Sequence, residues 1–252
     1  MIIKLGCCGY QKSRKKYFEE FRLIELQDIF YRFPKQETLK KWRTEAPSDF
    51  EFSVKASQFI THPPTSPTYK KANVTIKASE NYGFFKPTKE VFDAWNRTKE
   101  YCDILNAKVC IFQTPKSFRP TDENINNMIS FFSDISRDDL ILGWEPRGDE
   151  WSLKTIFQIV SKLDLIYVYD PFARAESLNS GIYYFRLHGK PPGKKMYNYD
   201  YTKDDLIWLQ SYITSIGDEE SVFYILFNNG IYSWNSAIRF KEILSKNKMK
   251  EL

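Results

Sequence analysis

The chain has 252 residues, of which 42% are hydrophobic, 17% aromatic and 27% charged. This length and composition allow a sizeable core and exclude a disordered chain, and the size is that of one α/β barrel. The net charge of +5 is a mild excess that favours anionic ligands slightly. It is spread along the chain and is too small for a dedicated nucleic-acid-binding protein.

Short apolar runs rich in β-branched and aromatic residues recur along the chain and alternate with segments of helical period. Several of these runs are apolar almost throughout, as strands covered on both faces must be. The eight predicted strands are Ile2–Cys7, Arg22–Leu26, Glu51–Lys55, Lys108–Gln113, Leu140–Glu145, Leu165–Asp170, Ile182–His188 and Val222–Phe227.

Helices are predicted between most strands, because apolar residues recur three and four positions apart. Such stripes lie within residues 91–105, 125–135, 156–163, 206–216 and 234–244. Thr202 and Asp205 predict a capping box at the start of one helix. Two links are irregular. The first, Gly9–Phe21, holds little helix, and the sixth, Phe172–Gly181, is too short for a full helix.

Eight strands separated mostly by helices predict a parallel sheet, and eight is the number that closes into a (β/α)8 barrel. An open doubly wound sheet is the alternative. The sequence shows no internal repeat and no low-complexity linker, so residues 1–252 are predicted to form one domain.

Ionisable or amide side chains lie at the end of nearly every predicted strand, which is where a barrel enzyme carries its catalytic groups. Structural ion pairs across the top of the barrel are the alternative interpretation. The strand-end residues are Glu25, Lys55, Gln113, Glu145, Arg147, Asp170, Arg186, His188, Asn228 and Asn229, with His62 shortly after the third strand.

Two long segments, Ser57–Thr88 and Gly189–Tyr201, follow predicted strands. In a barrel both lie on the catalytic face, where long loops commonly form lids or substrate walls. A solvated excursion is the alternative for each loop.

Six groups of residues, in order along nearly the whole chain, carry a resemblance to a known family. They are Ile24-Glu25 with Phe30–Pro34, Phe52–Ala56 with Ile60–His62, Phe112–Pro115 with Ser117-Phe118, Trp144–Arg147, Tyr184–Gly189, and Phe227–Asn229 with Asn235–Ala237. Together they resemble the YecE-like family, the domain of unknown function number seventy-two. The resemblance implies a barrel of the triosephosphate-isomerase type and implies no activity.

The opening Gly6-Cys7-Cys8-Gly9-Tyr10 departs from that family, in which Gly-Thr-Ser-Gly-Trp or a similar run is expected. If the missing hydroxyl groups contact a substrate, this member differs from its relatives in specificity.

The chemistry of the side chains gives candidate roles. Glu25 and Glu145 are a candidate general acid and base, provided that their surroundings separate their pKa values. Arg186 suits a carboxylate or phosphate, and His188, two residues along the same strand, suits proton transfer. Asp170 completes the candidate catalytic set. The alternative is that Asp170 or Glu145 pairs with Arg186 and that His188 packs in the core.

The remaining candidates are assigned to substrate binding. Lys55 suits an anion anchor better than a Schiff base. His62 is a candidate for closing over the mouth or for a simple turn, and Arg147 for binding substrate or pairing with Glu145. The full set of candidate substrate-binding residues is Tyr31, Arg32, Lys55, His62, Gln113, Arg147, Arg186, Tyr199, Asn228 and Asn229.

Three functions are weighed. The leading hypothesis is an enzyme that hydrolyses or isomerises a small polar, anionic substrate. The second is a metal-assisted hydrolase, in which Glu25, Glu145, Asp170 and His188 offer oxygen-rich ligands for Mg or Mn. The third is a nucleic-acid-binding module that uses loop 57–88, with Lys70, Lys71 and Lys77 near Tyr69, Tyr82, Phe84 and Phe85.

Other features limit the setting of the protein. The four cysteines have no C-x-x-C spacing and only two histidines occur, which argues against a structural zinc site and favours reduced thiols. No signal peptide and no run of roughly 18 apolar residues is found, so we expect a cytoplasmic protein without a membrane partner. The common nucleotide-binding glycine motifs are absent, and the cofactor and oligomeric state stay unknown.

Overall fold

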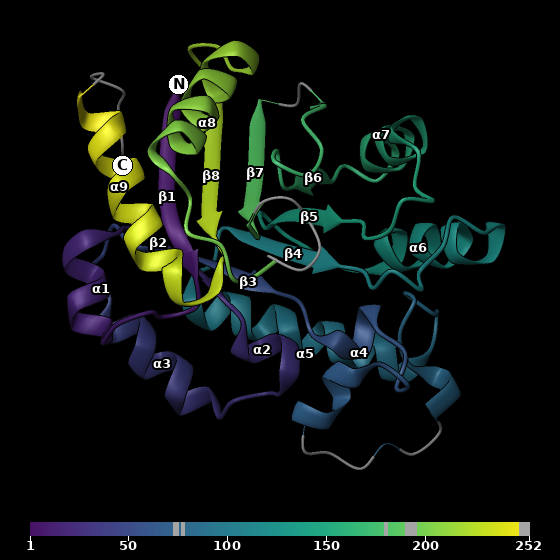
Figure 1. The fold of residues 1–252 in the computed structure, drawn as a ribbon. Coiled ribbons are helices and arrows are strands. Elements are labelled where there is room, and N and C mark those ends of the chain that lie inside the picture. The colour runs from purple at the N-terminus through teal and green to yellow at the C-terminus, as the bar shows by residue number, and fades with distance from the viewer. Residues whose placement is uncertain (73–75, 77–78, 179–180, 190–195, 247–252) are drawn as a thin grey trace. The chain divides into compact units, whose positions relative to one another are not determined.

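The computed structural model describes residues 1–72, 76, 79–178, 181–189 and 196–246 (Figure 1). Eight strands follow one another in chain order around a closed barrel. They are β1 (Ile2–Cys8), β2 (Leu23–Leu26), β3 (Glu51–Lys55), β4 (Val109–Gln113), β5 (Ile141–Glu145), β6 (Ile166–Tyr169), β7 (Ile182–Leu187) and β8 (Val222–Phe227). The predicted (β/α)8 barrel is confirmed, and the open sheet is not what forms.

The helices cover the predicted stripes. They are α1 (Arg14–Glu20), α2 (Asp28–Tyr31), α3 (Gln36–Glu45), α4 (Gln58–Thr61), α5 (Lys89–Leu105), α6 (Asp122–Asp134), α7 (Leu153–Lys162), α8 (Lys203–Ile216) and α9 (Ser233–Lys246), with short 3-10 helices η1 (Pro67–Lys71), η2 (Ser79–Asn81) and η3 (Gly230–Tyr232). The capping box of Thr202 and Asp205 opens α8. The first link holds only the seven-residue α1, and residues 170–178 contain no helix.

The chain divides into two compact units. The first consists of Met1–Glu25, Ala46–Glu51 and Ile166–Leu252, and the second of Leu26–Glu45 and Phe52–Leu165. In the first unit β1 pairs in parallel with β2 and β8, and β7 pairs with β8 and β6. In the second unit β4 pairs in parallel with β3 and β5. The prediction of one domain over 1–252 stays a prediction.

In the first unit the two faces of β7 have different neighbours. Tyr183 and Phe185 point to α8, where the Tyr183 hydroxyl donates to Ile216 O at 2.8 Å and Phe185 packs on Tyr212 at a centroid distance of 6.0 Å. Since side chains alternate along a strand, Tyr184 and Arg186 face the other way, into the barrel. Helix α9 packs on β1 and β8 (Figure 1).

In the second unit aromatic rings fill the space between β4 and the helices α5 and α6. Phe112 of β4 lies 5.6 Å from Trp95 of α5 and 5.0 Å from Phe132 of α6, measured between ring centroids. Phe85 packs against Phe112 and Phe132 and is 0% exposed. Much of the high aromatic content is therefore core.

All four cysteines are buried free thiols. No helix in the described part of the chain is long and apolar enough to cross a membrane.

Candidate active site

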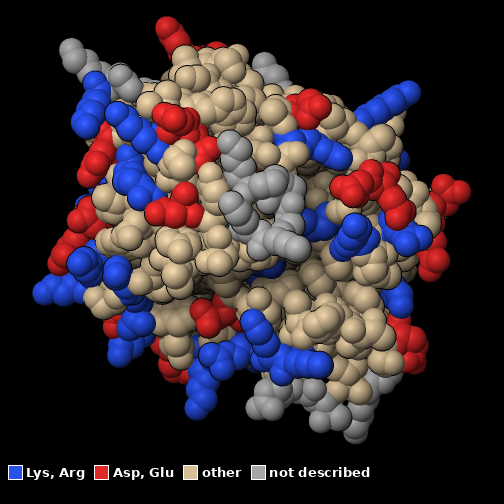
Figure 2. Space-filling model, viewed as in Figure 1, with Lys and Arg blue, Asp and Glu red and all other residues tan. Residues whose placement is uncertain are grey.

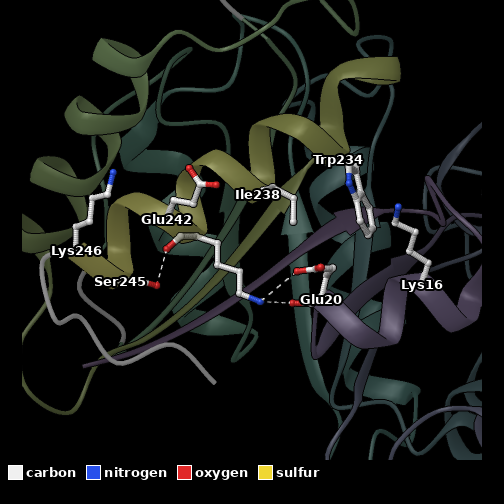
Figure 3. Close-up of a pocket in the computed structure, with 8 residues that line it drawn as sticks. Lys16, Glu20, Trp234, Ile238, Glu242, Ser245 and Lys246 are labelled. Carbon is white, nitrogen blue, oxygen red and sulfur yellow. Dashed lines mark hydrogen bonds and ion pairs between the residues drawn. The ribbon is translucent and has the colours of Figure 1, made fainter.

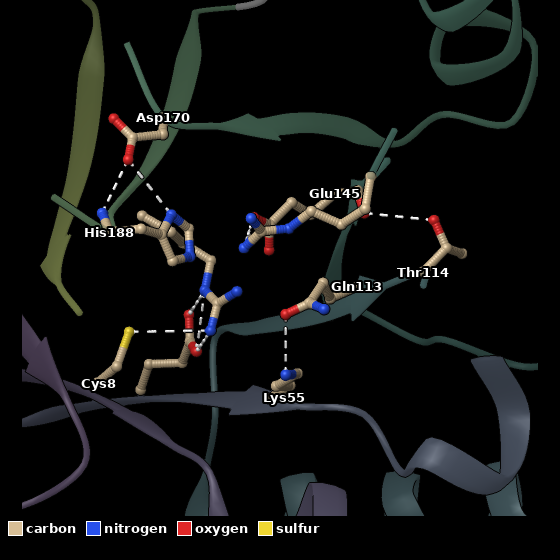
Figure 4. A network of polar contacts seen from close by, with 10 residues as sticks. Cys8, Lys55, Gln113, Thr114, Glu145, Asp170 and His188 are labelled. Carbon is tan, nitrogen blue, oxygen red and sulfur yellow. Dashed lines mark hydrogen bonds and ion pairs between the residues drawn. The ribbon is translucent and has the colours of Figure 1, made fainter. Parts of the chain in front are cut away.

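A buried ion pair joins the carboxyl-terminal parts of β2 and β7 in the first unit (Figure 4). Arg186 Nε donates to Glu25 Oε1 and Oε2 at 3.1 and 2.9 Å, and Arg186 Nη2 donates to Oε1 at 2.8 Å. The Tyr184 hydroxyl donates to Oε2 at 2.9 Å. Both charged side chains are 0% exposed. So many donors on one carboxylate indicate that Glu25 holds Arg186 and Tyr184 in place.

Cys8 lies beside this ion pair at the end of β1, with its Sγ 4.0 Å from Arg186 Nη2. Burial, and next the charge of Glu25, raises the pKa of the Cys8 thiol well above its usual value. The thiol therefore stays neutral and is no resting nucleophile. The departure from the family's hydroxyl residues thus falls at a residue that contacts Arg186.

A second pair in the first unit joins Asp170 and His188, which directly follow the neighbouring strands β6 and β7 (Figure 4). Asp170 Oδ2 lies 3.3 Å from His188 Nδ1 and accepts a hydrogen bond from the His188 backbone N at 2.7 Å. Asp170 Oδ1 accepts from the backbone N of Phe172 at 3.0 Å. A carboxylate only accepts hydrogen bonds, so the neutral imidazole beside it carries its proton on Nδ1 and a lone pair on Nε2.

The residues after β7 are tied to α8 and β8. The Tyr201 hydroxyl accepts from Gly189 N at 2.8 Å, and the Tyr199 hydroxyl donates to Asp205 Oδ2 at 2.7 Å. Burial, and next the hydrogen bond to Asp205, raises the pKa of Tyr199 to about 12. Tyr199 is a predicted substrate-binding residue, and the structure places its hydroxyl at the start of α8. Residues 190–195 of the predicted loop lie outside the described residues.

The two predicted asparagines after β8 differ in their contacts. Asn229 is buried, and its Nδ2 donates to Tyr199 O at 2.8 Å and to Ser236 Oγ at 3.0 Å. Its Oδ1 has no hydrogen-bond partner among the described residues. Asn228 is half-buried, and its backbone N donates to Leu187 O at 2.9 Å. Asn229 therefore joins the segment after β7 to helix α9.

In the second unit Glu145 ends β5, and its Oε1 lies 2.7 Å from Nη2 of Arg147. The side chain of Glu145 is 4% exposed and that of Arg147 is 22% exposed. The backbone carbonyl of Glu145 accepts from Thr114 N at 3.0 Å, and Thr114 Oγ1 accepts from Trp144 Nε1 at 3.2 Å. The structure thus shows the pairing of Arg147 with Glu145.

Lys55, at the end of β3, is 5% exposed and contacts an amide oxygen and an aromatic ring. Its Nζ donates to Gln113 Oε1 at 2.9 Å (Figure 4) and lies 3.7 Å from the centroid of the Phe30 ring. An ammonium over an aromatic face is attracted by the ring quadrupole. Two predicted residues, Lys55 and Gln113, are therefore brought together at the ends of β3 and β4.

His62 follows α4 and is 4% exposed, so it is packed and not a residue on an open loop. Its Nδ1 lies 2.8 Å from Thr61 Oγ1, and its ring packs edge-on against Phe30 at 5.0 Å. Burial, and next the charge of Lys55, lowers the pKa of His62 to about 3. His62 is therefore neutral in the physiological range and unsuited to proton transfer.

The remaining predicted residues, Tyr31 and Arg32, lie at the end of α2. The carbonyl of Tyr31 accepts from Gln58 Nε2 at 3.2 Å, and Lys71 Nζ lies 5.0 Å from the Tyr31 ring centroid. Arg32 is 68% exposed and pairs with Asp28 at 3.9 Å. Arg32 is the most exposed of the predicted site residues in this unit and has no buried role.

Two residues that contact predicted site residues, Tyr184 and Thr114, were not predicted as site residues from the sequence. Tyr184 is two positions before Arg186, so the alternation of a strand places both on one face, and this signal could have found it. Thr114 directly follows Gln113, but nothing in the sequence indicates that its hydroxyl meets Trp144 and that its backbone N donates to Glu145 O.

The metal hypothesis needs several ligands in one place. Among the described residues, no group of three or more His, Cys, Asp or Glu side chains lies where it could hold a metal ion. Glu25 is engaged by Arg186, and Asp170 by His188. The donor set required for Mg or Mn is therefore not assembled within the part of either unit that the structure describes.

The aromatic residues of loop 57–88 pack against other rings. Tyr69 and Tyr82 contact Phe59 at 5.5 and 5.6 Å, and Phe84 contacts Phe118 at 5.5 Å. Lys77 lies outside the described residues. Figure 2 shows Lys and Arg interspersed with Asp and Glu over the face in view. These contacts support the packing interpretation of the loop, and nucleic-acid binding stays a prediction without a structural argument.

A groove of the first unit lies outside the barrel, along α1 and α9 (Figure 3). Its volume is about 640 Å³, and Trp234 and Ile238 lie among Lys and Glu side chains in its wall. Lys241 Nζ lies 3.8 Å from Glu20 Oε2 there. None of the predicted site residues lines this groove.

The chain is similar to one protein family and to several solved structures. The family described as "Protein of unknown function DUF72" matches residues 8–251. A DUF72 family protein from Enterococcus faecalis V583 has a TM-score of 0.73 and 18% identity, covering 97% of this chain and 98% of that chain. One from Thermotoga maritima MSB8 has a TM-score of 0.72 and 19% identity, covering 97% and 100%.

A xylose isomerase domain containing protein from Salmonella typhimurium LT2 has a TM-score of 0.59 and 12% identity, covering 98% of this chain and 97% of that chain. At these identities the likeness to solved structures shows the fold alone. None of the curated proteins matches the chain.

Proposed function

The chain belongs to the DUF72 family of proteins of unknown function, and on that premise we propose that it is an enzyme that acts by acid–base chemistry on a small polar, anionic substrate. His188 is the group that exchanges the proton with the substrate. Asp170 is a positioning residue that acts through His188. Hydrolysis and isomerisation are the reaction classes that this chemistry serves.

One observation carries the proposal, namely the contact of Asp170 Oδ2 with both the ring Nδ1 and the backbone N of His188. Three donors, counting Phe172 N, fix the carboxylate, and the carboxylate fixes the imidazole. A base that is oriented by a carboxylate in this way is the arrangement on which acid–base enzymes of several folds depend.

The position of the pair supports the same conclusion. Asp170 and His188 follow two neighbouring strands at their carboxyl ends, where barrel enzymes of known activity carry their catalytic groups. His188 is 2% exposed, so its proton exchange is shielded from bulk water. Fold alone names no activity, so it is the contact between Asp170 and His188 that indicates one.

The proton follows a closed path in this proposal. His188 Nε2 takes a proton from a substrate C–H or from a water that attacks the substrate. The imidazolium that forms keeps its Nδ1 proton, and Asp170 stabilises its charge. The same proton then returns from Nε2 to a neighbouring atom of the substrate or to the leaving group, which restores the neutral imidazole.

The anionic character of the substrate is supported by the net charge of +5, which favours anionic ligands slightly. The predicted roles of Lys55, Arg147, Tyr31, Gln113 and Asn228 as substrate contacts stay predictions.

The first test uses the fact that the chain has only two histidines. Nitrogen-15 spectra of histidine-labelled protein resolve both rings, and His62→Gln assigns them. We expect His188 to carry its proton on Nδ1, and Asp170→Asn to remove this preference, because an amide can donate as well as accept. A His188 ring protonated on Nε2 in the wild type would contradict the proposal.

The second test measures turnover. Wild type is incubated in heavy water with sugar phosphates and hydroxy acids, and deuterium incorporation and phosphate release are followed. General acid–base catalysis contributes typically about 100- to 10,000-fold, so His188→Gln should lose at least about 100-fold. His62→Gln is the matched control and should keep its rate. Equal loss in both variants would remove the distinction between the two histidines.

A further inference from the structure

A cavity of about 330 Å³ lies directly after Asp170 in the first unit. Its walls are Pro171, Phe172, Ala173, Arg174 and Ala175 from the segment after β6, and Trp208 from α8. The volume is at the lower end of the range for small-molecule sites, about 300 to 1,000 Å³. A site of this size admits one ring with a small substituent.

The segment that forms the wall of this cavity is hydrogen-bonded to Asp170. The carbonyl of Asp170 accepts from the backbone N of Ala173 and of Arg174, both at 3.0 Å. The side chain of Asp170 accepts from Phe172 N through Oδ1 and from His188 through Oδ2. Asp170 therefore fixes both the segment that forms the pocket wall and the imidazole of His188, which links the pocket to the proposed acid–base group.

Trp208 presents an aromatic surface that is already fixed in place. Its ring is stacked on Tyr212 with centroids 5.4 Å apart and planes 6° apart, and lies 4.8 Å from Phe172. The Tyr212 hydroxyl in turn donates to Ala175 O. Trp208 is still 40% exposed, although large apolar side chains are seldom so exposed in this molecule. A rigid, partly exposed ring binds a flat partner at little cost in conformational entropy.

Arg174 adds a positive charge to the same wall. A guanidinium has five N–H donors in a fixed fork, so it can bind an anion while keeping other contacts. An aromatic face together with a guanidinium matches a ligand that carries a planar ring and an anionic group. The groove along α1 and α9 has Trp234 and lysines in its wall but, among the described residues, no arginine, so it lacks this pairing of a ring with a guanidinium.

We propose that the cavity formed by residues 171–175 and Trp208 is the substrate subsite for a planar ring bearing a phosphate or carboxylate. The ring lies on Trp208, and Arg174 binds the anionic group. This inference rests on the proposed function, since it assigns the cavity to the substrate on which His188 acts, but binding in the cavity is measured without turnover.

The test uses phenyl phosphate as the probe, with inorganic phosphate and phenol as its two halves, and titration calorimetry of the full chain. We expect phenyl phosphate to bind the wild type more tightly than either half does. Stacking of a ring on an aromatic side chain is worth about 1–3 kcal/mol, so Trp208→Ala should weaken binding by about 5- to 150-fold. Trp208→Phe should retain most of the affinity, and Arg174→Gln should weaken phenyl phosphate and inorganic phosphate alike.

Ile207→Ala is the matched control, because Ile207 is the preceding residue of α8 and is also 40% exposed. Its affinity should equal that of the wild type. The proposal is overturned if phenyl phosphate binds no better than inorganic phosphate, or if Trp208→Ala and Ile207→Ala have the same affinity. The tautomer of His188 is measured on the same samples and tests the proposed function separately. The proposal of the subsite can therefore be contradicted while that of His188 and Asp170 is not.

Discussion

The two histidines of the chain lie in different units and are buried to a similar extent, 4% for His62 and 2% for His188, yet their neighbours are opposite in character. His188 faces the carboxylate of Asp170. His62 faces a hydroxyl and an aromatic ring, and Lys55 helps to lower its pKa. Burial alone makes a histidine inert, whereas burial beside a carboxylate can make it an oriented base.

The buried ion pairs of the two units also differ in their surroundings. Glu25 is fully buried with Arg186 and receives four hydrogen bonds from Arg186 and Tyr184. Glu145 pairs with Arg147, whose side chain reaches solvent. Water can therefore solvate one partner of the second pair but neither partner of the first. The first pair is accordingly more costly to break.

The largest effect is expected from Glu25→Gln. This change leaves the guanidinium of Arg186 buried without its charge partner, which typically costs about 3–5 kcal/mol in the free energy of unfolding. Urea denaturation measures the loss. Tyr184→Phe is the control, because it removes one hydrogen bond to the same carboxylate and should cost only about 1–2 kcal/mol. If the two variants lose equal stability, the ion pair has no special energetic role.

An intermediate effect is expected from His62 as the pH falls. The unfolded chain binds a proton at His62 near pH 6.5, whereas the folded protein binds it only near pH 3. Between these values the unfolded state holds more protons, so acid favours unfolding. The slope is at most about 1.4 kcal/mol per pH unit, and roughly 1 is expected after allowing for partial solvation.

Unfolding of the wild type and of His62→Gln, measured by urea from pH 7 to pH 4, isolates this contribution. The variant lacks the titrating group and should lose less stability over the range. If the free energy of unfolding falls equally with pH in the two proteins, His62 is protonated as readily in the folded state as in the unfolded state. The proposed contrast between His62 and His188 would then be wrong.

The smallest effect is expected from Glu145→Gln. Arg147 is 22% exposed and can be solvated when its partner loses its charge, so the expected cost is about 1 kcal/mol. The variant is measured in the same urea series as Glu25→Gln. A loss as large as that of Glu25→Gln would show that the pair of the second unit is as tightly coupled as that of the first.

Much of the fold follows from the sequence, because buried strands must be apolar and their polar ends are visible in the chain. Val222–Phe227 and Glu51–Lys55 are found with the predicted bounds. The pairing of side chains could not be predicted in the same way. Arg186 was assigned Asp170 or Glu145 as alternative partners, but the structure pairs it with Glu25 and gives Asp170 to His188. Strand register and rotamer choice decide such partners, and no local pattern encodes them.

The same limit applies to the predicted binding residues. Tyr199 and Asn229 have the chemistry of ligand contacts, yet the Tyr199 hydroxyl and the Asn229 amide fasten the segment before α8 to its neighbours. His62 resembled a loop residue because it precedes a proline, but the aromatic ring of Phe30 encloses it. A side chain that is able to bind a substrate is equally able to bind its own backbone, and only the three-dimensional contacts distinguish the two.

The pairing of β1 with β8 has a consequence for synthesis. Ile2 is the partner of Val222, so β1 is synthesised about 220 residues before β8 and waits for it before their shared hydrogen bonds can form. The second unit can form its internal contacts once residue 165 has been synthesised. Contacts between distant parts of a chain form slowly, and an unpaired edge is prone to aggregation meanwhile. During translation the second unit is therefore expected to fold first, and β1 and β8 to pair last.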